Sequence, residues 1–306
     1  MHLPDRIRIR EVSPRDGLQG EPVPVATADK IRLVDMLSAA GFARINVTSF
    51  VSPRAVPQMA DAEQVMAGIE RRPGVVYDAS VPNPRGAQRA LDAGVDALVV
   101  FVDASDAGNR RSVNRSREDA EQGAVTLIGD ARERGFPVVA TVATAFGCPY
   151  EGVIPEERVL AMADRFVAAG ATGLALGDTT GEATPRHVAR LVGTLLDRHP
   201  EVELGLHFHD TRGLALANVL AAMDVGATNF DSAVGGIGGN PFLDNASGNL
   251  ATEDLVHMCE EMGVETGVDL DAVIETYRFV EETVQHRLPG KVGRVGRSKT
   301  PIAGPA

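Results

Sequence analysis

Ala169-Gly170-Ala171-Thr172 decides the fold, because here a helix ends at a glycine and an apolar strand begins within about four residues. The same unit occurs at three other places: Ala40-Gly41-Phe42-Ala43, Ala93-Gly94-Val95-Asp96 and Val225-Gly226-Ala227-Thr228. A helix that stops at a glycine just before a strand is typical of a βα repeat. The four similar helix ends therefore predict a chain built from repeated βα units.

Eight segments have the length and hydrophobic pattern of strands, the first by alternating apolar and charged residues: residues 7–12, 43–49, 75–81, 97–103, 138–144, 173–178, 204–209 and 229–234. Their alternation with helical segments favours a closed (βα)8 barrel, the TIM barrel of the α/β class, over an open doubly wound sheet. The first strand is not followed by GxGxxG, which also argues against a dinucleotide-binding fold.

Two further helices, near residues 251–262 and 270–286, exceed the barrel and are expected to pack across or beside its mouth. We therefore predict one barrel domain over residues 1–290 that includes these helices. Residues 291–306 mix Gly, Pro, Arg and Lys without periodicity, and we expect them to form a flexible tail.

Composition indicates a small-molecule enzyme. The 306 residues are 44% hydrophobic, enough for a sizeable core, and no run approaches the ~18 apolar residues of a membrane span. The first residues lack the basic-then-apolar order of a signal peptide, so a cytoplasmic location is expected. The net charge of −12 disfavours a nucleic-acid partner, and two cysteines are too few for a disulfide scaffold or a thiolate metal cage.

The stretch Leu204-Gly205-Leu206-His207-Phe208-His209-Asp210-Thr211 carries the first chemical signal. In a β-strand, His207 and His209 point to the same face. Neutral imidazoles at this spacing can bind one divalent transition metal ion. The alternative is a pair of histidines that are hydrogen-bonded within a strand.

Other polar residues follow the predicted strands at the end where barrels place their chemistry. They are Arg15 and Asp16, Asn46 with Thr48 and Ser49, Asp178 with Thr179, His207 with His209 and Asp210, and Asn240 with Asn249. A carboxylate, two imidazoles and an amide oxygen suit Mg²⁺, Mn²⁺ or Zn²⁺ with open positions for a substrate. Taken alone, Asp16 could cap a loop and Asn249 could cap a helix.

Two charged residues next to these ligands have candidate roles of their own. Arg15 stays protonated and could stabilise an oxyanion or enolate, or it could form a structural salt bridge. Asp178 could orient a histidine by hydrogen bonding, or it could cap a loop.

Residues 109–115, which include Asn109, Arg110 and Arg111, form the densest basic cluster of this acidic chain. They could bind the phosphates of a nucleotide-like ligand such as coenzyme A, or they could form a solvated basic loop. Cys148 follows the fifth strand and is expected to be a packed thiol.

Several motifs at separate strand ends resemble the 3-hydroxy-3-methylglutaryl-CoA lyase family, one of the metallolyase barrels with an Arg-Asp pair after the first strand. The similarity spans residues 6–290 in consistent order. Its motifs are EVSPRDGLQ (11–19), TSFVSP (48–53), GCPYEG (147–152), LGDT (176–179), HFHDT (207–211) and ASGNLATED (246–254).

The resemblance implies a divalent cation held by Asp16, His207, His209 and Asn249, with Arg15 polarising the carbonyl of an acyl-CoA thioester. In this family, a base removes the proton of a tertiary hydroxyl group. The carbon–carbon bond then breaks into an acetyl-CoA enolate and a keto acid. Gln19 and Thr179 belong to the shared motifs and are expected to contact the substrate. Family relatives are often dimers, so a homodimer is also expected, although no interface pattern in the sequence decides it.

Two positions depart from the pattern of this family. Its second-strand glutamate is replaced by Asn46, and the catalytic cysteine of its glycine-rich loop is replaced by Asn240. Amides do not exchange protons near neutral pH, so neither residue can act as a general acid or base. Three functions stay open: a lyase or aldolase with a different substrate, for which citramalyl-CoA is one candidate; a slow 3-hydroxy-3-methylglutaryl-CoA lyase; and a catalytically silent ligand binder. In the first, Asn46 and Asn240 would bind the substrate, while water or His207 would move protons.

Overall fold

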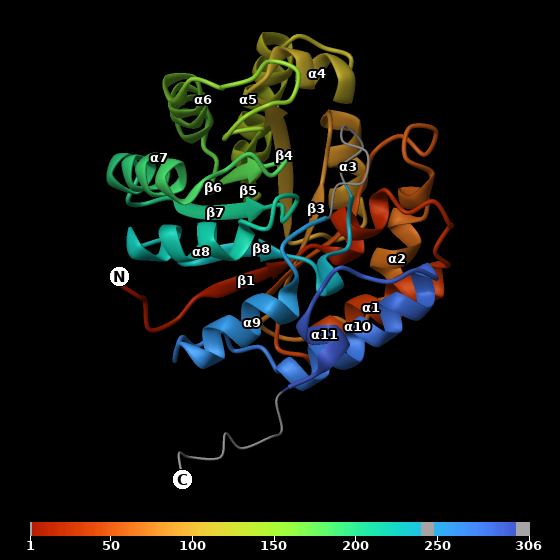
Figure 1. Cartoon of the computed structure of the whole chain (residues 1–306). Helices are drawn as coiled ribbons and strands as arrows, with labels where there is room; N and C mark the ends of the chain where they lie inside the picture. Colours follow the sequence, from red (N-terminus) through yellow and green to blue (C-terminus); the bar gives the residue numbers. More distant parts are fainter. Residues whose placement is uncertain (1, 240–247, 298–306) are drawn as a thin grey trace.

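The chain forms a closed barrel of eight parallel strands surrounded by helices (Figure 1). The computed structural model describes residues 2–239 and 248–297. Each strand pairs with its neighbours in chain order, and β1 closes the barrel against β8. The strands are β1 (Arg8–Glu11), β2 (Arg44–Ser49), β3 (Val76–Ser80), β4 (Ala97–Asp103), β5 (Val138–Ala143), β6 (Gly173–Asp178), β7 (Glu203–Phe208) and β8 (Asn229–Ser232).

Helices follow every strand of the barrel. They are α1 (Thr27–Ala39), α2 (Ala62–Gly68), α3 (Pro84–Asp92), α4 (Asp106–Ser112), α5 (Arg117–Glu133), α6 (Glu156–Ala169), α7 (Pro185–Arg198), α8 (Ala215–Asp224), α9 (Thr252–Glu261), α10 (Leu270–Val284) and α11 (Val292–Val295). Three short helical turns also occur among the described residues: η1 (Ser13–Gly17), η2 (Pro57–Met59) and η3 (Val234–Gly236). Across residues 2–239 and 248–297, no helix is both long and apolar enough to cross a lipid bilayer.

The predicted (βα)8 barrel is confirmed, and each predicted strand differs from the observed one by at most two residues at either end. The four glycines that suggested the repeat, Gly41, Gly94, Gly170 and Gly226, have φ angles of 98°, 78°, 106° and 100°. This left-handed conformation ends a helix and is readily adopted only by glycine. The repeated helix ends therefore have a common physical cause.

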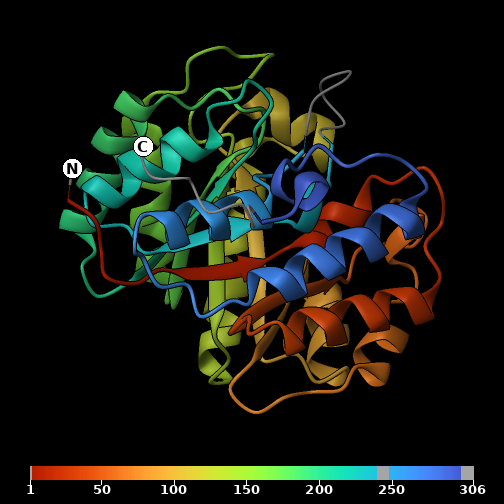
Figure 2. The same ribbon diagram turned by 60° about the horizontal axis from the view of Figure 1, so that its bottom comes forward.

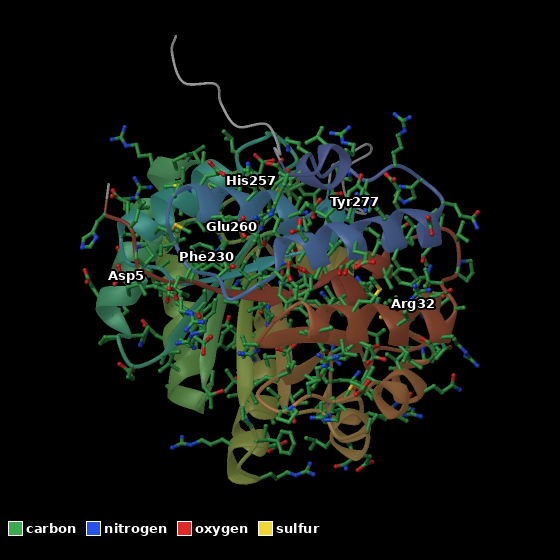
Figure 3. The ribbon with its side chains drawn as sticks, turned by 90° about the horizontal axis from the view of Figure 1, so that it is seen from below. Asp5, Arg32, Phe230, His257, Glu260 and Tyr277 are labelled. Atoms are coloured by element: carbon green, nitrogen blue, oxygen red, sulfur yellow. The ribbon has the colours of Figure 1, made fainter. Side chains whose placement is uncertain are left out.

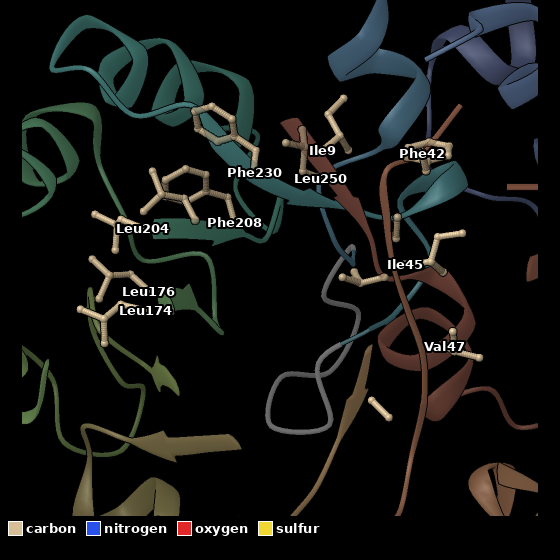
Figure 4. Close-up of a cluster of buried hydrophobic side chains, with 14 of the residues drawn as sticks. Ile9, Phe42, Ile45, Val47, Leu174, Leu176, Leu204, Phe208, Phe230 and Leu250 are labelled. Atoms are coloured by element: carbon tan, nitrogen blue, oxygen red, sulfur yellow. The ribbon is translucent and has the colours of Figure 1, made fainter. Parts of the chain in front are cut away.

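The main core lies between the outer face of the barrel and the helices. Figure 4 shows alternate residues from several strands on this face, among them Ile9, Ile45, Leu176, Phe208 and Phe230. The intervening residues face the barrel interior, because successive side chains of a strand point to opposite faces. Part of this interior is filled by a separate small apolar cluster of Val99, Val139 and Ala175.

The helices after β8 lie beside the barrel, next to α1 and β1 (Figures 1 and 2). Seen from below in Figure 3, α9 carries His257 and Glu260, and α10 carries Tyr277 on the same side of the molecule. Helix α10 packs on α1 and α9 and also reaches η3 at the barrel mouth. The two additional helices are confirmed, and α10 lies beside the mouth, one of the two expected positions, through its contact with η3.

The predicted tail begins too early. The backbone N–H groups of Lys291 and Val292 donate to Asp254 Oδ1 at 2.9 and 2.7 Å, and α11 follows directly. Residues 291–297 are thus folded against α9, because a buried carboxylate accepts their backbone N–H groups. The remainder, residues 298–306, lies outside the described residues.

Candidate metal centre

The cluster predicted from the sequence assembles at the carboxyl ends of the strands. Asp16 lies in η1 directly after β1, His207 lies in β7 and His209 follows it. A backbone bridge pairs His209 with Asn249 and brings the chain after the glycine-rich loop to the same place. One ligand atom from each of Asp16, His207 and His209 lies within 4.8 Å of the others, so this group could hold a metal ion.

Short distances join these side chains. His207 Nε2 lies 3.1 Å from His209 Nε2 and 3.7 Å from Asp16 Oδ2. Asn249 Nδ2 donates to Asp16 Oδ2 at 3.0 Å and to the carbonyl oxygen of Ile237 at 2.9 Å. The buried Asn249 Oδ1 has no hydrogen-bond partner within the described residues. A carboxylate, two imidazole nitrogens and a free amide oxygen fit a divalent cation.

The protonation states of Asp16 and His209 also suit a metal site. Burial alone would raise the pKa of Asp16, but the charges of Arg15 and the two histidines lower it to about 2. Burial lowers the pKa of His209 to about 4, assisted by the charge of His207. Burial also acts to lower the pKa of His207, but the hydrogen bond to Asp231 and the charge of Asp16 outweigh it and raise this pKa. At neutral pH, Asp16 is therefore a carboxylate and His209 a neutral imidazole.

Arg15 is fixed beside the cluster. Its Nη1 donates to Asp16 Oδ1 at 2.6 Å, and its guanidinium lies 5.6 Å from the centre of the Phe101 ring. The buried Arg15 Nε has no partner within the described residues. The guanidinium thus combines the predicted salt bridge with N–H groups that remain free to bind an oxyanion.

Asp178 caps a loop, the second of its two predicted roles. Its Oδ1 accepts the backbone N–H groups of Glu182 and Ala183 at 2.7 and 3.0 Å. No hydrogen bond joins it to a histidine in the described chain, and Asp231 orients His207 instead. Burial raises the pKa of Asp178 to about 7, and its Oδ2 has no hydrogen-bond partner among the described residues. Asp178 could therefore carry a proton near neutral pH.

Sequence reasoning missed Asp231 and Arg10. Asp231 Oδ2 lies 3.1 Å from His207 Nδ1, and Arg10 forms a bidentate ion pair with Asp231. The strand alternation contained this information, because Arg10 and Asp231 are interior positions of β1 and β8. Placing the two side chains beside His207 also required the strand register, which pairs Asp231 with His207 and with Arg10.

Asn46 lies in the barrel interior, where other side chains already bind its amide. Its Nδ2 donates to Asp78 Oδ1 at 2.5 Å, and its Oδ1 accepts from Ser80 Oγ at 3.4 Å. The side chain is buried, so its orientation is fixed before any substrate arrives. Asn240, the other predicted amide, lies outside the described residues.

The residues predicted to bind substrate are spread around the mouth. The basic segment after β4 forms α4, in which Arg110 pairs with Asp106 and the guanidinium of Arg111 lies 4.4 Å from the Tyr150 ring. Asn109 does not support the predicted phosphate contact. It is buried, and its Nδ2 donates to the carbonyl oxygens of Asp103 and Ser105, so its amide anchors α4.

Two other predicted contact residues and the cysteine lie nearby. Gln19 is partly buried one turn after Asp16. Thr179 Oγ1 accepts the backbone N–H of Thr144 at 2.9 Å. Cys148 is a buried thiol, as predicted.

A parallel barrel with this cluster at its carboxyl end and an arginine beside it defines a class, the metallolyase-type barrel enzymes. The HMGL-like family model matches residues 6–280. Hydroxymethylglutaryl-CoA lyase YngG of Bacillus subtilis is 42% identical over 298 residues, which cover 97% of this chain and 100% of the relative.

Two further relatives agree. A 3-hydroxy-3-isohexenylglutaryl-CoA/hydroxymethylglutaryl-CoA lyase of Pseudomonas aeruginosa is 43% identical over 90% of this chain and 92% of its own length. The solved structure of an HMG-CoA lyase from Acinetobacter baumannii, in complex with coenzyme A and 3-methylmalate, superimposes with a TM-score of 0.92. It is 42% identical and covers 97% of this chain and 98% of its own. The chain belongs to the HMGL-like family and is a carbon–carbon lyase.

Proposed function

We infer that this enzyme cleaves a 3-hydroxyacyl-CoA thioester into an acyl-CoA and a keto acid, with a divalent cation as cofactor. The observation that carries this function is the grouping of Asp16, His207 and His209 beside Arg15. The relatives at 42–43% identity support the reaction class, since each is named for cleavage of a branched 3-hydroxyglutaryl-CoA.

Residues of this chain would bind the substrate and transfer protons at its reacting carbons, C2 and C3. Loss of the hydroxyl proton at C3 lets the C2–C3 bond break, and its electron pair passes to the thioester as an enolate. C3 becomes the carbonyl of the keto acid, and C2 then takes up a proton. A Mg²⁺ or Mn²⁺ ion held by Asp16, His207, His209 and Asn249 would act as a Lewis acid that favours loss of the hydroxyl proton.

Arg15 would bind the thioester oxygen as negative charge develops on it. A guanidinium beside Asp16 is already oriented, so it needs no rearrangement in the transition state. Asp178 is our candidate for the group that exchanges a proton with the substrate, because its Oδ2 is free within the described chain and its pKa is near 7.

We further propose that the substrate differs from 3-hydroxy-3-methylglutaryl-CoA in the part that faces β2. The family resemblance implies a glutamate at position 46, but here an amide is bound to Asp78 and Ser80. Loss of a general acid or base typically costs ~10²- to 10⁴-fold in rate. A substrate whose cleavage does not need a carboxylate at this position would avoid that loss.

The test is a panel of 3-hydroxyacyl-CoA thioesters, among them 3-hydroxy-3-methylglutaryl-CoA, its 3-isohexenyl analogue and citramalyl-CoA. Each is incubated with Mg²⁺ or Mn²⁺, and products are identified by mass spectrometry. We expect an acyl-CoA and a keto acid from at least one thioester, and no product with Asp16→Asn. Binding by calorimetry without product from any thioester would favour the silent ligand binder instead.

The ordinary 3-hydroxy-3-methylglutaryl-CoA lyase is the second candidate, favoured by the 42% identity to YngG. It requires that 3-hydroxy-3-methylglutaryl-CoA be the best substrate of the panel. It also predicts that Asn240→Cys raises the rate, because a thiol can donate the proton that an amide cannot. An unchanged rate would exclude this loop position as the proton donor.

A further inference from the structure

A ladder of buried charges lies inside the barrel below the metal centre. Arg10 donates to Asp231 Oδ1 from Nε at 2.8 Å and to Asp231 Oδ2 from Nη2 at 2.5 Å. Its Nη1 lies 3.7 Å from Asp78 Oδ2, and Arg44 Nε donates to the same oxygen at 2.5 Å. Since β1 is separated from β3 by β2, the contact between Arg10 and Asp78 runs through the barrel interior.

Stability alone does not account for this ladder. Barrel interiors are commonly filled by apolar layers, and a buried ion pair often contributes no more than a hydrophobic group of similar volume. The ladder instead ends on the functional site. Asp231 lies at hydrogen-bond distance from the candidate ligand His207, and Asp78 accepts from Asn46.

The contacts of Asp231 determine which nitrogen of His207 carries a proton. Both carboxylate oxygens accept N–H groups of Arg10, so Asp231 presents acceptors only. His207 Nδ1, 3.1 Å from Asp231 Oδ2, must therefore donate. In the neutral ring, the lone pair of Nε2 is then left for the side that faces Asp16 and His209.

We propose that Arg10 and Asp231 are a positioning pair that keeps the proton of His207 on Nδ1 and thereby makes Nε2 a metal ligand. The pair acts through His207 and does not touch the substrate. This assignment rests on the metal site of the proposed function but not on the reaction itself. His209 has no such support, because its buried Nδ1 lacks a hydrogen-bond partner in the described part of the chain.

Substitution of Asp231 by asparagine should weaken metal binding. An amide cannot accept at both positions, so either Arg10 or His207 loses its acceptor. Loss of the hydrogen-bond partner of a metal-ligating histidine typically lowers metal affinity ~10- to 100-fold. Asp78→Asn is the matched control, since Asp78 is an equally buried carboxylate of the same ladder and no hydrogen bond links it to a histidine of the described chain.

The first measurement uses the native protein without metal. Nitrogen-15 NMR of histidine-labelled enzyme at pH 8, with His207→Gln to assign the signals, should show a protonated Nδ1 and an unprotonated Nε2 on His207. An unprotonated Nδ1 would overturn the proposal. This experiment decides the question even if Asp231→Asn does not fold.

The second measurement compares Mn²⁺ affinities by calorimetry. Asp231→Asn should bind ~10- to 100-fold more weakly than the native enzyme, and Asp78→Asn should lose less affinity, because Asp78 makes no hydrogen bond to a histidine of the described chain. Equal losses in both variants, or none in folded Asp231→Asn, would refute the positioning role. Neither readout uses a substrate, so failure of every thioester to turn over would reject the proposed function while leaving this test intact.

Discussion

Replacing Glu11 by glutamine should stabilise the protein at alkaline pH. Glu11 ends β1 and is fully buried. Its Oε1 accepts the N–H groups of Ser13 and Val234 at 2.9 and 3.2 Å, and its Oε2 accepts the hydroxyl of Thr252 at 2.6 Å. Burial raises the pKa of Glu11 to about 7, although these hydrogen bonds act to lower it.

The sign of the effect follows from the two protonation states. The ordinary pKa is 4.5, so the unfolded chain loses this proton as the pH rises above 4.5, while the folded protein retains it up to about pH 7. Stability from this group is thus fully present below pH 4.5 and is lost as the pH rises through 7. The difference between the pKa values of the folded and unfolded states corresponds to about 3 kcal/mol of unfolding free energy.

Glutamine can keep every hydrogen bond of Glu11. Its amide oxygen can accept from Ser13 and Val234, and its amide nitrogen can donate to Thr252. The hydroxyl of Thr252 then donates to Ser232 Oγ, which lies 2.7 Å away. The neutral variant should therefore match the native protein near pH 4.5 and exceed its unfolding free energy by about 3 kcal/mol at pH 8.

The assay is urea unfolding followed by circular dichroism, at several pH values between 4.5 and 8 and with a chelator present. Glu133→Gln, at an exposed position of α5, is the matched control and should leave the pH profile unchanged. A Glu11→Gln variant that is less stable than the native protein at pH 8, or a stability difference that does not depend on pH, would contradict this prediction.

Three further predictions concern the site and the core. Asp16→Asn should lower Mn²⁺ affinity at least ~100-fold by calorimetry, and an unchanged affinity would show that Asp16 is not a ligand. Asp178→Asn should lower kcat by ~10²- to 10⁴-fold while the melting temperature is kept, because its amide oxygen can still cap the loop; full activity would assign Asp178 to the loop alone. Gly293→Ala should cost about 1–3 kcal/mol in urea unfolding, since its Cβ would lie 2.2 Å from the buried Tyr277 ring. Gly129→Ala in α5, where a Cβ meets no atom within 4 Å, should be neutral or stabilising, and equal losses would contradict the clash.

The barrel could be predicted because its determinants are local. A strand of a parallel barrel is a short apolar run, and its helix ends at a glycine with positive φ, as at Gly41 and Gly170. Both signals are visible within a few residues of sequence. The grouping of Asp16 with His207 and His209 followed from the rule that strand ends of a barrel share one face.

The charges inside the barrel could not be predicted in the same way. Arg10 and Asp231 are 221 residues apart, and their contact depends on the closure of β1 against β8. The basic residues around Asn109 suggested a phosphate contact, but its amide instead binds backbone carbonyl groups under α4. The homodimer stays a prediction, which light scattering during size-exclusion chromatography would test.

Anomalous diffraction from a crystal soaked in Mn²⁺ tests the central claim most directly, because it locates the ion without assuming a substrate. We predict one strong peak bound by Asp16, His207, His209 and Asn249, within reach of the Arg15 guanidinium. A peak elsewhere, or none while these side chains keep their present arrangement, would contradict it.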